Sequence, residues 1–141
     1  MAVGANARKF ILQSEEGRPV HRRMLNGATA LQAGEMVTLS SNTLAEVADS
    51  NTVGAVGICA QDIAASSYGT VYVAGMFKGS AASGVNFALG DAVYNASAST
   101  LDAGTAGDVP VGKVVHTDPA EAGTVWFELW SIILNEIDAK S

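Results

Sequence analysis

Short runs of β-branched and aromatic residues, each bordered by glycine or small polar residues, occupy the chain from residue 34 onward. They alternate apolar with polar or small side chains, which is the period of a strand that has one face against a core, and helical periodicity is absent. An all-β fold is therefore predicted, either a small sandwich or a small barrel. The runs are EMVTLS (35–40), GAVGICA (54–60), GTVYVAGMF (69–77), DAVYN (91–95), VGKVV (111–115) and GTVWFELW (123–130).

An internal repeat indicates that the β region consists of two modules, at about 34–79 and 90–130. Each module has one half-apolar sheet face, and packing the two faces together would bury both. In each module a glycine and an acidic residue precede the first strand, which predicts a turn stabilised by the carboxylate. The recurring pairs, at offsets of 54 to 57 residues, are GEMV (34–37) with GDAV (90–93), Thr43-Leu44 with Thr100-Leu101, Val56-Gly57 with Val111-Gly112, and GTVY (69–72) with GTVW (123–126).

Charge divides the chain differently from hydropathy. Residues 1–34 contain five basic and two acidic side chains, whereas residues 35–141 contain three basic and twelve acidic ones. The length of 141 residues suits a single domain, and the acidic body disfavours binding to nucleic acid. We therefore expect a basic N-terminal arm at 1–33, a β domain at 34–130 and a C-terminal tail at 131–141, whose pattern fits a strand or an amphipathic turn equally well.

The arm mixes cationic and apolar side chains, which suggests contact with a partner. A solvated tail and a nucleic-acid arm are alternatives, but we favour an arm laid on an acidic protein surface. There, arginine side chains pair with carboxylates while apolar side chains enter grooves or add a strand to a neighbouring sheet. The acidic body of another copy would offer such a surface. The basic residues are Arg8, Lys9, Arg18, Arg22 and Arg23, and the apolar ones are Phe10, Ile11, Leu12, Met24 and Leu25.

Residues that suggest catalysis or ligand binding do not form a complete motif. GDVPVGKV at 107–114 approaches a phosphate-binding loop, but Val114 replaces the hydroxyl residue that holds magnesium. Cys59 and His116 suggest a thiol–imidazole pair, yet the repeat aligns Cys59 with Val114, so we expect a buried structural cysteine. No catalytic residue, cofactor or metal is predicted, and the protein is not expected to be an enzyme. The acids that could surround calcium lack the spacing of a calcium loop and are expected to be solvated: Asp102, Asp108, Asp118 and Glu121.

The most apolar run, WFELWSIIL at 126–134, is too short to span a bilayer and contains Glu128. The first residues do not follow a secretory pattern, and a single cysteine cannot form an internal disulfide. We therefore expect synthesis in the cytoplasm and no membrane partner.

Several strings within residues 34–130 resemble the capsid cement, or head decoration, proteins of tailed bacteriophages: GEMVTLS, VGAVGICAQDIA, YGTVYVAGMFKG and GDAVY. The resemblance implies a non-enzymatic virion protein, made in the host cytoplasm, that binds the outer surface of the head. It implies that the protein bridges subunits of the major capsid protein and stabilises the shell. The implied partners are the major capsid protein and further copies of this chain, with a trimer favoured over a dimer.

On this interpretation the arm supplies most of the contacts, and Trp130 adds apolar area. Trp126, the repeat partner of Tyr72, is expected in the core instead. The alternatives are a tail or fibre β module, a carbohydrate-binding β-sandwich that uses the aromatic residues Tyr68, Tyr94 and Trp130, and a double-barrel enzyme without a recognisable nucleophile. The expected partner-binding residues are Arg8, Lys9, Phe10, Arg18, Arg22, Arg23 and Trp130.

Overall fold

A computed structural model of the chain describes residues 10–13, 19–47, 51–117, 123–134 and 136–140. These residues form strands, turns and irregular segments without a helix, which confirms the all-β prediction. Accordingly, the described part of the chain holds no helix of the length and apolarity that crossing a membrane requires. The strands are β1 (Ile11–Leu12), β2 (Val20–Leu25), β3 (Met36–Ser40), β4 (Thr43–Glu46), β5 (Gly57–Cys59), β6 (Tyr68–Ala74), β7 (Met76–Ala81), β8 (Ala92–Ser97), β9 (Thr100–Asp102), β10 (Gly112–Thr117) and β11 (Thr124–Leu129).

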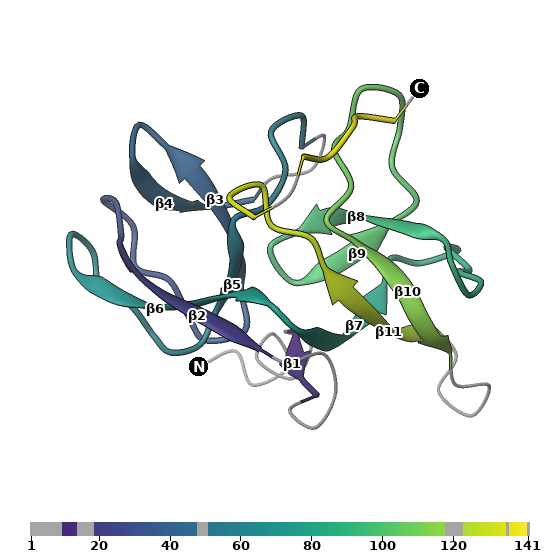
Figure 1. Ribbon diagram of the computed structural model, residues 1–141, viewed down its shortest axis with the longest axis horizontal. Coiled ribbons are helices and arrows are strands. Elements are labelled where there is room, and N and C mark those ends of the chain that lie inside the picture. The colour runs from purple at the N-terminus through teal and green to yellow at the C-terminus, as the bar shows by residue number, and fades with distance from the viewer. Residues whose placement is uncertain (1–9, 14–18, 48–50, 118–122, 135, 141) are drawn as a thin grey trace.

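The strands form two sheets that lie side by side as two lobes (Figure 1). The five-stranded lobe has the order β2-β6-β5-β3-β4, and the six-stranded lobe has the order β1-β7-β11-β10-β8-β9. In the six-stranded lobe β7 also pairs with β9 in parallel, through Ser80 with Thr100 and Ala81 with Leu101. This pairing closes five strands into a small barrel, and β1 pairs with the earlier part of the same edge of β7, at Phe77 and Lys78.

The five-stranded lobe approaches the same closure. Asn26, which follows β2, forms an isolated parallel bridge with Leu44 of β4. The order β2-β6-β5-β3-β4 therefore corresponds strand by strand to β7-β11-β10-β8-β9, with a parallel contact at the same point of each circuit. The two-module hypothesis stays an interpretation, and this correspondence supports it.

The turns that open the two sets of strands share one geometry. Gly34 and Gly90 have φ angles of 85° and 86°, in the left-handed region that favours glycine. Glu35 accepts a hydrogen bond from the Gln32 N–H at 2.6 Å, and Asp91 accepts one from the Ala88 N–H at 2.8 Å. Both carboxylates therefore stabilise a turn, as their place beside glycine predicts.

The sheet register shifts one of the expected equivalences by two residues. Ile58 of β5 pairs with Tyr72, whereas Lys113 of β10 pairs with Glu128, so Tyr72 corresponds to Glu128 rather than to Trp126. Its match with Tyr72 suggested that Trp126 lies in the core, but the structure places it outside the core. It is half-buried and packs against the ring of His116, with a centroid distance of 5.1 Å.

The two lobes share a hydrophobic core. Met36 and Ile58 of the five-stranded lobe pack with Phe77 and Phe127 of the barrel. The chain passes from β6 directly into β7 through Gly75, whose φ of 140° suits a residue without a Cβ atom. The lobes therefore form one folded unit.

The described residues show no break in packing at residue 33, where we placed the boundary of the arm. β2 is a strand of the five-stranded sheet, and Leu31 is buried in the same lobe. The C-terminal segment packs back on the body as well: the Ile132 N–H donates to Ala55 O at 2.9 Å, and the Lys140 N–H donates to Asp108 O at 2.8 Å. Residues 132–134 form a turn and not a strand.

Candidate functional site

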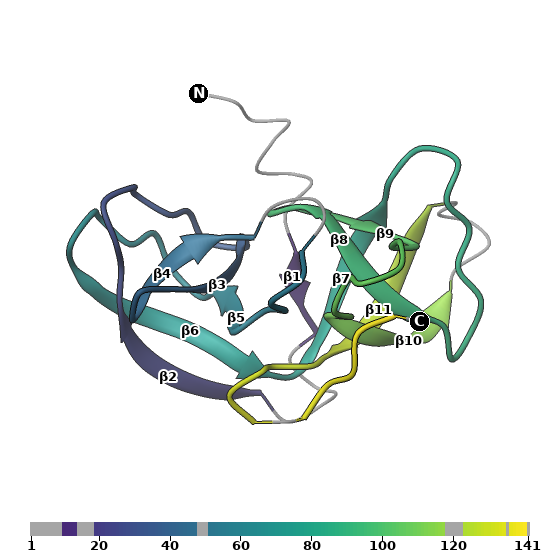
Figure 2. The same cartoon turned by 90° about the horizontal axis from the view of Figure 1, so that it is seen from above.

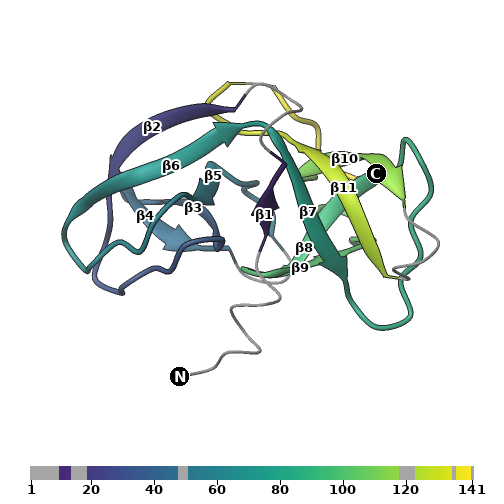
Figure 3. The ribbon, with the colours of Figure 1, turned by 90° about the horizontal axis from the view of Figure 1, so that it is seen from below.

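The most distinctive surface of the molecule is the basic strand β2. It pairs with β6 and runs along the outside of the five-stranded lobe (Figures 2 and 3). Three consecutive residues of this strand are exposed: His21, Arg22 and Arg23. Because most of the chain is acidic, this strand concentrates positive charge on a body of the opposite sign.

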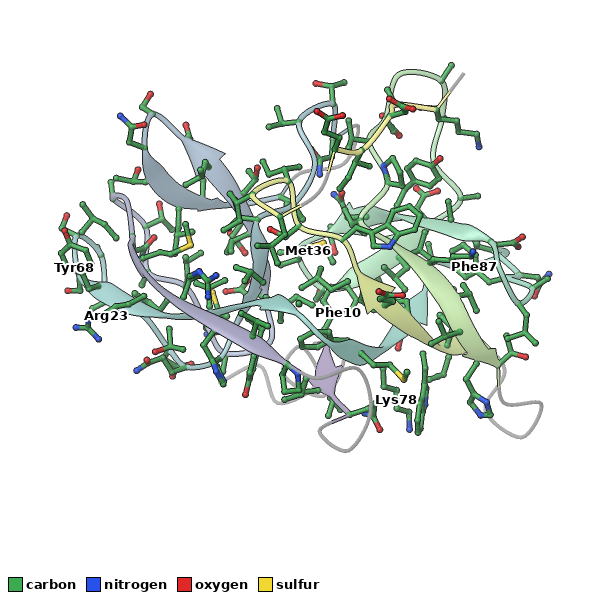
Figure 4. All side chains as sticks on the ribbon, viewed as in Figure 1. Phe10, Arg23, Met36, Tyr68, Lys78 and Phe87 are labelled. Carbon is green, nitrogen blue, oxygen red and sulfur yellow. The ribbon has the colours of Figure 1, made fainter. Side chains whose placement is uncertain are left out.

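Neighbouring groups hold the three side chains in place. The Arg23 guanidinium lies 5.8 Å from the centre of the Tyr68 ring, a cation–π arrangement. Tyr68 is 60% exposed, so this pair is accessible at the outer end of the lobe (Figure 4). Arg22 donates from Nη1 to His21 O at 2.9 Å, and the His21 ring lies 4.6 Å from the ring of Tyr72.

A buried amide fixes the end of β2 to the rest of the lobe. The Asn26 side chain, 1% exposed, donates to Thr29 O at 2.8 Å, to Ile63 O at 3.1 Å and to Ala64 O at 3.2 Å. Its Oδ1 accepts the Gly27 N–H at 2.8 Å. A buried polar group with this many partners specifies one local arrangement, so β2 has a defined position.

The structure brings together only part of the expected contact residues. Arg22 and Arg23 lie side by side on β2, whereas Arg8, Lys9 and Arg18 lie outside the described residues. Trp130 is half-buried and belongs to a different feature, a pocket of about 350 Å³ that it shares with Pro110 and with residues 136–138.

Phe10, which we expected in the contact surface, is buried in the hydrophobic core. Its ring meets Phe127 edge to face, at a centroid distance of 5.4 Å and an interplanar angle of 77°. A Cβ atom on Gly79 would lie only 2.7 Å from the Phe10 ring, so this glycine provides the space that the ring fills. We therefore leave Phe10 out of the contact surface.

The residues that suggested chemistry lie apart. Cys59 is buried in β5, and burial, together with the nearby Glu35 carboxylate, raises the pKa of its thiol to about 12. His116 lies on β10 in the other sheet and is exposed. Residues 107–114 lead into strand β10, not into the helix that a phosphate-binding loop requires. Within the described ranges, no three side chains of metal-binding type gather.

The acidic residues of the 102–108 loop stabilise that loop. Asp102 accepts the Gly104 N–H at 2.9 Å, and Asp108 accepts the Thr105 N–H at 3.0 Å. Asp108 is buried, so its expected place in solvent is wrong. Asp118 and Glu121 lie outside the described residues.

Tyr94, one of the aromatic residues considered for sugar binding, is buried beneath Lys140, whose Nζ lies 5.4 Å from the ring centre. Burial and the nearby Asp108 raise the pKa of its hydroxyl. Of the three aromatic residues considered for sugar binding, only Tyr68 is exposed, since Tyr94 is buried and Trp130 is half-buried.

Tyr68 and His21 were not among the expected contact residues. The strand period of YGTVYVA places Tyr68, Thr70 and Tyr72 on one face, so the sequence held a signal for this face of β6. It held no signal that β2 would lie against β6, because that pairing joins partners that lie 43 to 54 positions apart in the sequence.

These observations define a small all-β protein with an exposed basic strand. The family model of phage cement proteins matches residues 17–129, a range that includes β2 and every later strand and that begins after β1. The chain therefore belongs to the phage cement protein family, a structural family, and is a component of the phage capsid. No curated protein and no solved structure matches the chain.

Proposed function

We propose that this protein binds the outer surface of the phage head, bridges neighbouring major capsid protein subunits and so stabilises the shell. The observation that carries the proposal is the exposed row His21, Arg22 and Arg23 on an otherwise acidic molecule of a cement family. Arginine side chains bind carboxylates through paired hydrogen bonds, which gives orientation as well as attraction.

This function requires binding to other proteins and no chemical reaction. A cement protein stabilises a shell when it binds more than one subunit at once, because separating the subunits then requires breaking both contacts. Several copies joined in one oligomer, for which we favour a trimer, increase the effective concentration of each contact. Individually weak contacts then give tight attachment.

The proposal is tested with heads purified from phage that lack this protein. Wild-type protein mixed with such heads is expected to co-sediment with them, and Arg22→Gln and Arg23→Gln are each expected to weaken binding about twofold to fivefold. Lys113→Gln, which removes an exposed charge from β10, is the matched control and is expected to bind like the wild type. Added salt weakens the wild type more than either arginine variant.

Two further measurements address the remaining parts of the proposal. DNA-filled heads carrying the protein are expected to release their DNA at a higher temperature than heads without it. Light scattering coupled to gel filtration gives the number of copies in the free oligomer. Failure of the wild-type protein to co-sediment at low salt would remove the proposal.

A further inference from the structure

The outer edge of β2 has a counterpart in the other lobe, where a strand is already paired with it. β2 and β7 occupy the same place in the two matching strand orders. The Asn26 N–H donates to Ser67 O at 2.8 Å where β2 meets β6, and the Ala81 N–H donates to Gly123 O at 2.6 Å where β7 meets β11. These two bonds align the strands, with Asn26 equivalent to Ala81.

Three residues before these bonds, the two strands present equivalent outer edges. The residues there are Arg23 on β2, opposite Thr70, and Lys78 on β7, opposite Trp126. In an antiparallel ladder, main-chain groups alternate between facing the partner strand and facing away. Asn26 and Ala81 direct their N–H groups at the partner, so Arg23 and Lys78 direct theirs to the other side.

Only one of these two outer edges is paired within the part of the chain that the structure describes. On β7, Ile11 of β1 pairs with Lys78, and Leu12 pairs with Phe77. On β2, no described strand pairs with Arg23 from the outer side. Figure 4 shows the contrast, because Lys78 lies beside β1 whereas Arg23 lies at the free outer end of the other lobe.

A neighbouring hydrogen bond marks the same difference. The Gln13 N–H donates to Met76 O at 2.8 Å, which is a main-chain bond to the outer edge of β7. The equivalent carbonyl on β2 belongs to His21, five residues before Asn26 as Met76 is five residues before Ala81. His21 O instead accepts from the Arg22 side chain at 2.9 Å. A guanidinium thus takes the place of a main-chain donor, which protects an edge strand from unwanted pairing.

Charge identifies the partner that fits this edge. A strand added beside β2 would lie between the exposed side chains of Arg22 and Arg23, which favour carboxylates. A second copy's first strand fits less well, because Arg8 and Lys9 directly precede Phe10 in the sequence and would repel this edge.

We propose that an extended acidic segment of the capsid protein adds as a strand to the outer edge of β2. Main-chain hydrogen bonds form at Arg23, carboxylates of the segment pair with Arg22 and Arg23, and an N–H of the segment replaces the guanidinium on His21 O. This inference rests on the proposed binding to the head, and it adds the binding mode and the chemistry of the partner.

Two variants at one position separate strand addition from charge attraction. Arg23→Gln removes the charge, whereas Arg23→Pro also removes the outward N–H without breaking the β2–β6 ladder. With heads that lack the protein, Arg23→Pro is expected to bind about tenfold more weakly than Arg23→Gln. Equal binding of the two variants overturns strand addition and leaves the proposed attachment to the head intact.

Amide hydrogen exchange on the wild-type protein provides the second readout, which does not depend on a variant that folds. The Arg23 amide is expected to exchange fast in the free protein and at least tenfold more slowly on the heads. Co-sedimentation without this slowing overturns the inference. Slowing in the free protein as its concentration rises also overturns it, because a second copy of the chain is then the occupant.

Discussion

Cys59 on β5 occupies the position that Val114 occupies on β10. The Gly34 N–H donates to Cys59 O at 2.8 Å, and the Gly90 N–H donates to Val114 O at 2.9 Å. Both side chains are buried, and cysteine at this site acts as a small apolar residue. The internal repeat in the sequence had already aligned these two positions. A buried position of this size accepts either cysteine or valine.

The buried thiol predicts a loss of stability in alkali. Its pKa is raised from 9.0 to about 12, so between these values the unfolded chain releases a proton that the folded chain keeps. The contribution is fully present below pH 9 and decreases as pH rises, because ionisation favours unfolding. Urea unfolding at pH 7 and pH 10 is expected to show that wild type loses about 1 kcal/mol more than Cys59→Val. Equal losses in both proteins would contradict the burial of the thiol.

At the scale of the strands, the recurring Val-Gly pair has a steric cause. A Cβ atom on Gly57 would collide with Tyr72 O, and one on Gly112 would collide with Glu128 O. Each glycine lets β5 or β10 approach its neighbouring strand closely where the sheet curves. The two strands therefore require the same residue for the same reason.

This close approach predicts that both glycines resist substitution. Gly57→Ala and Gly112→Ala are each expected to lower the free energy of unfolding by about 2–3 kcal/mol, because the strands must separate. Gly84→Ala is the comparison variant: it has a φ of 81° and nothing within 4 Å of the added atom. Its expected cost of about 1 kcal/mol comes from the backbone alone. Denaturant unfolding followed by circular dichroism measures all three, and equal costs would contradict the steric explanation.

The sequence predicted strands where apolar alternation was unbroken, as in β6 and β11. It did not predict β2 as part of the body, because His21, Arg22 and Arg23 interrupt the period. It also read 69–77 as one run, whereas the structure divides that run at Gly75 between two sheets. A glycine inside a strand pattern does not reveal whether the chain bends there.

The candidate site was predictable in its charge and not in its geometry. Arg22 and Arg23 stand out by their charge, so the sequence predicted them as contact residues, and the structure places both on the exposed part of β2. Phe10 stands among the same cations, yet it fills the space above Gly79, almost seventy residues later. Only tertiary packing separates a buried aromatic residue from an exposed one in a segment without periodicity.

For the whole molecule, the shared core predicts a single unfolding transition. The five-stranded lobe has a buried cluster of its own, but Met36 and Ile58 belong to the same cluster as Phe77 and Phe127 of the barrel, so separating the lobes would expose core residues of both. The only tryptophans, Trp126 and Trp130, lie on β11 and directly after it, so their fluorescence reports on the six-stranded lobe.

Tryptophan fluorescence and far-ultraviolet circular dichroism are therefore expected to give the same midpoint in urea. Circular dichroism reports on both sheets, so a second transition seen only by this method would mean that the five-stranded lobe unfolds by itself. Amide exchange of Val71 on β6 and Phe127 on β11 offers a local check, with equal protection expected for a cooperative unit.

The direct connection of β6 to β7 through Gly75 affects how a cement protein responds to force. At this point the two lobes are joined by the continuous chain of β6 and β7. β6 forms a hydrogen-bonded ladder with β2, and β7 forms one with β11, so both ladders lie along this chain. Tension that pulls the lobes apart along this line loads many hydrogen bonds in shear at once, instead of opening them one after another. A molecule with this connection would transmit force from a protein bound to one lobe to a protein bound to the other.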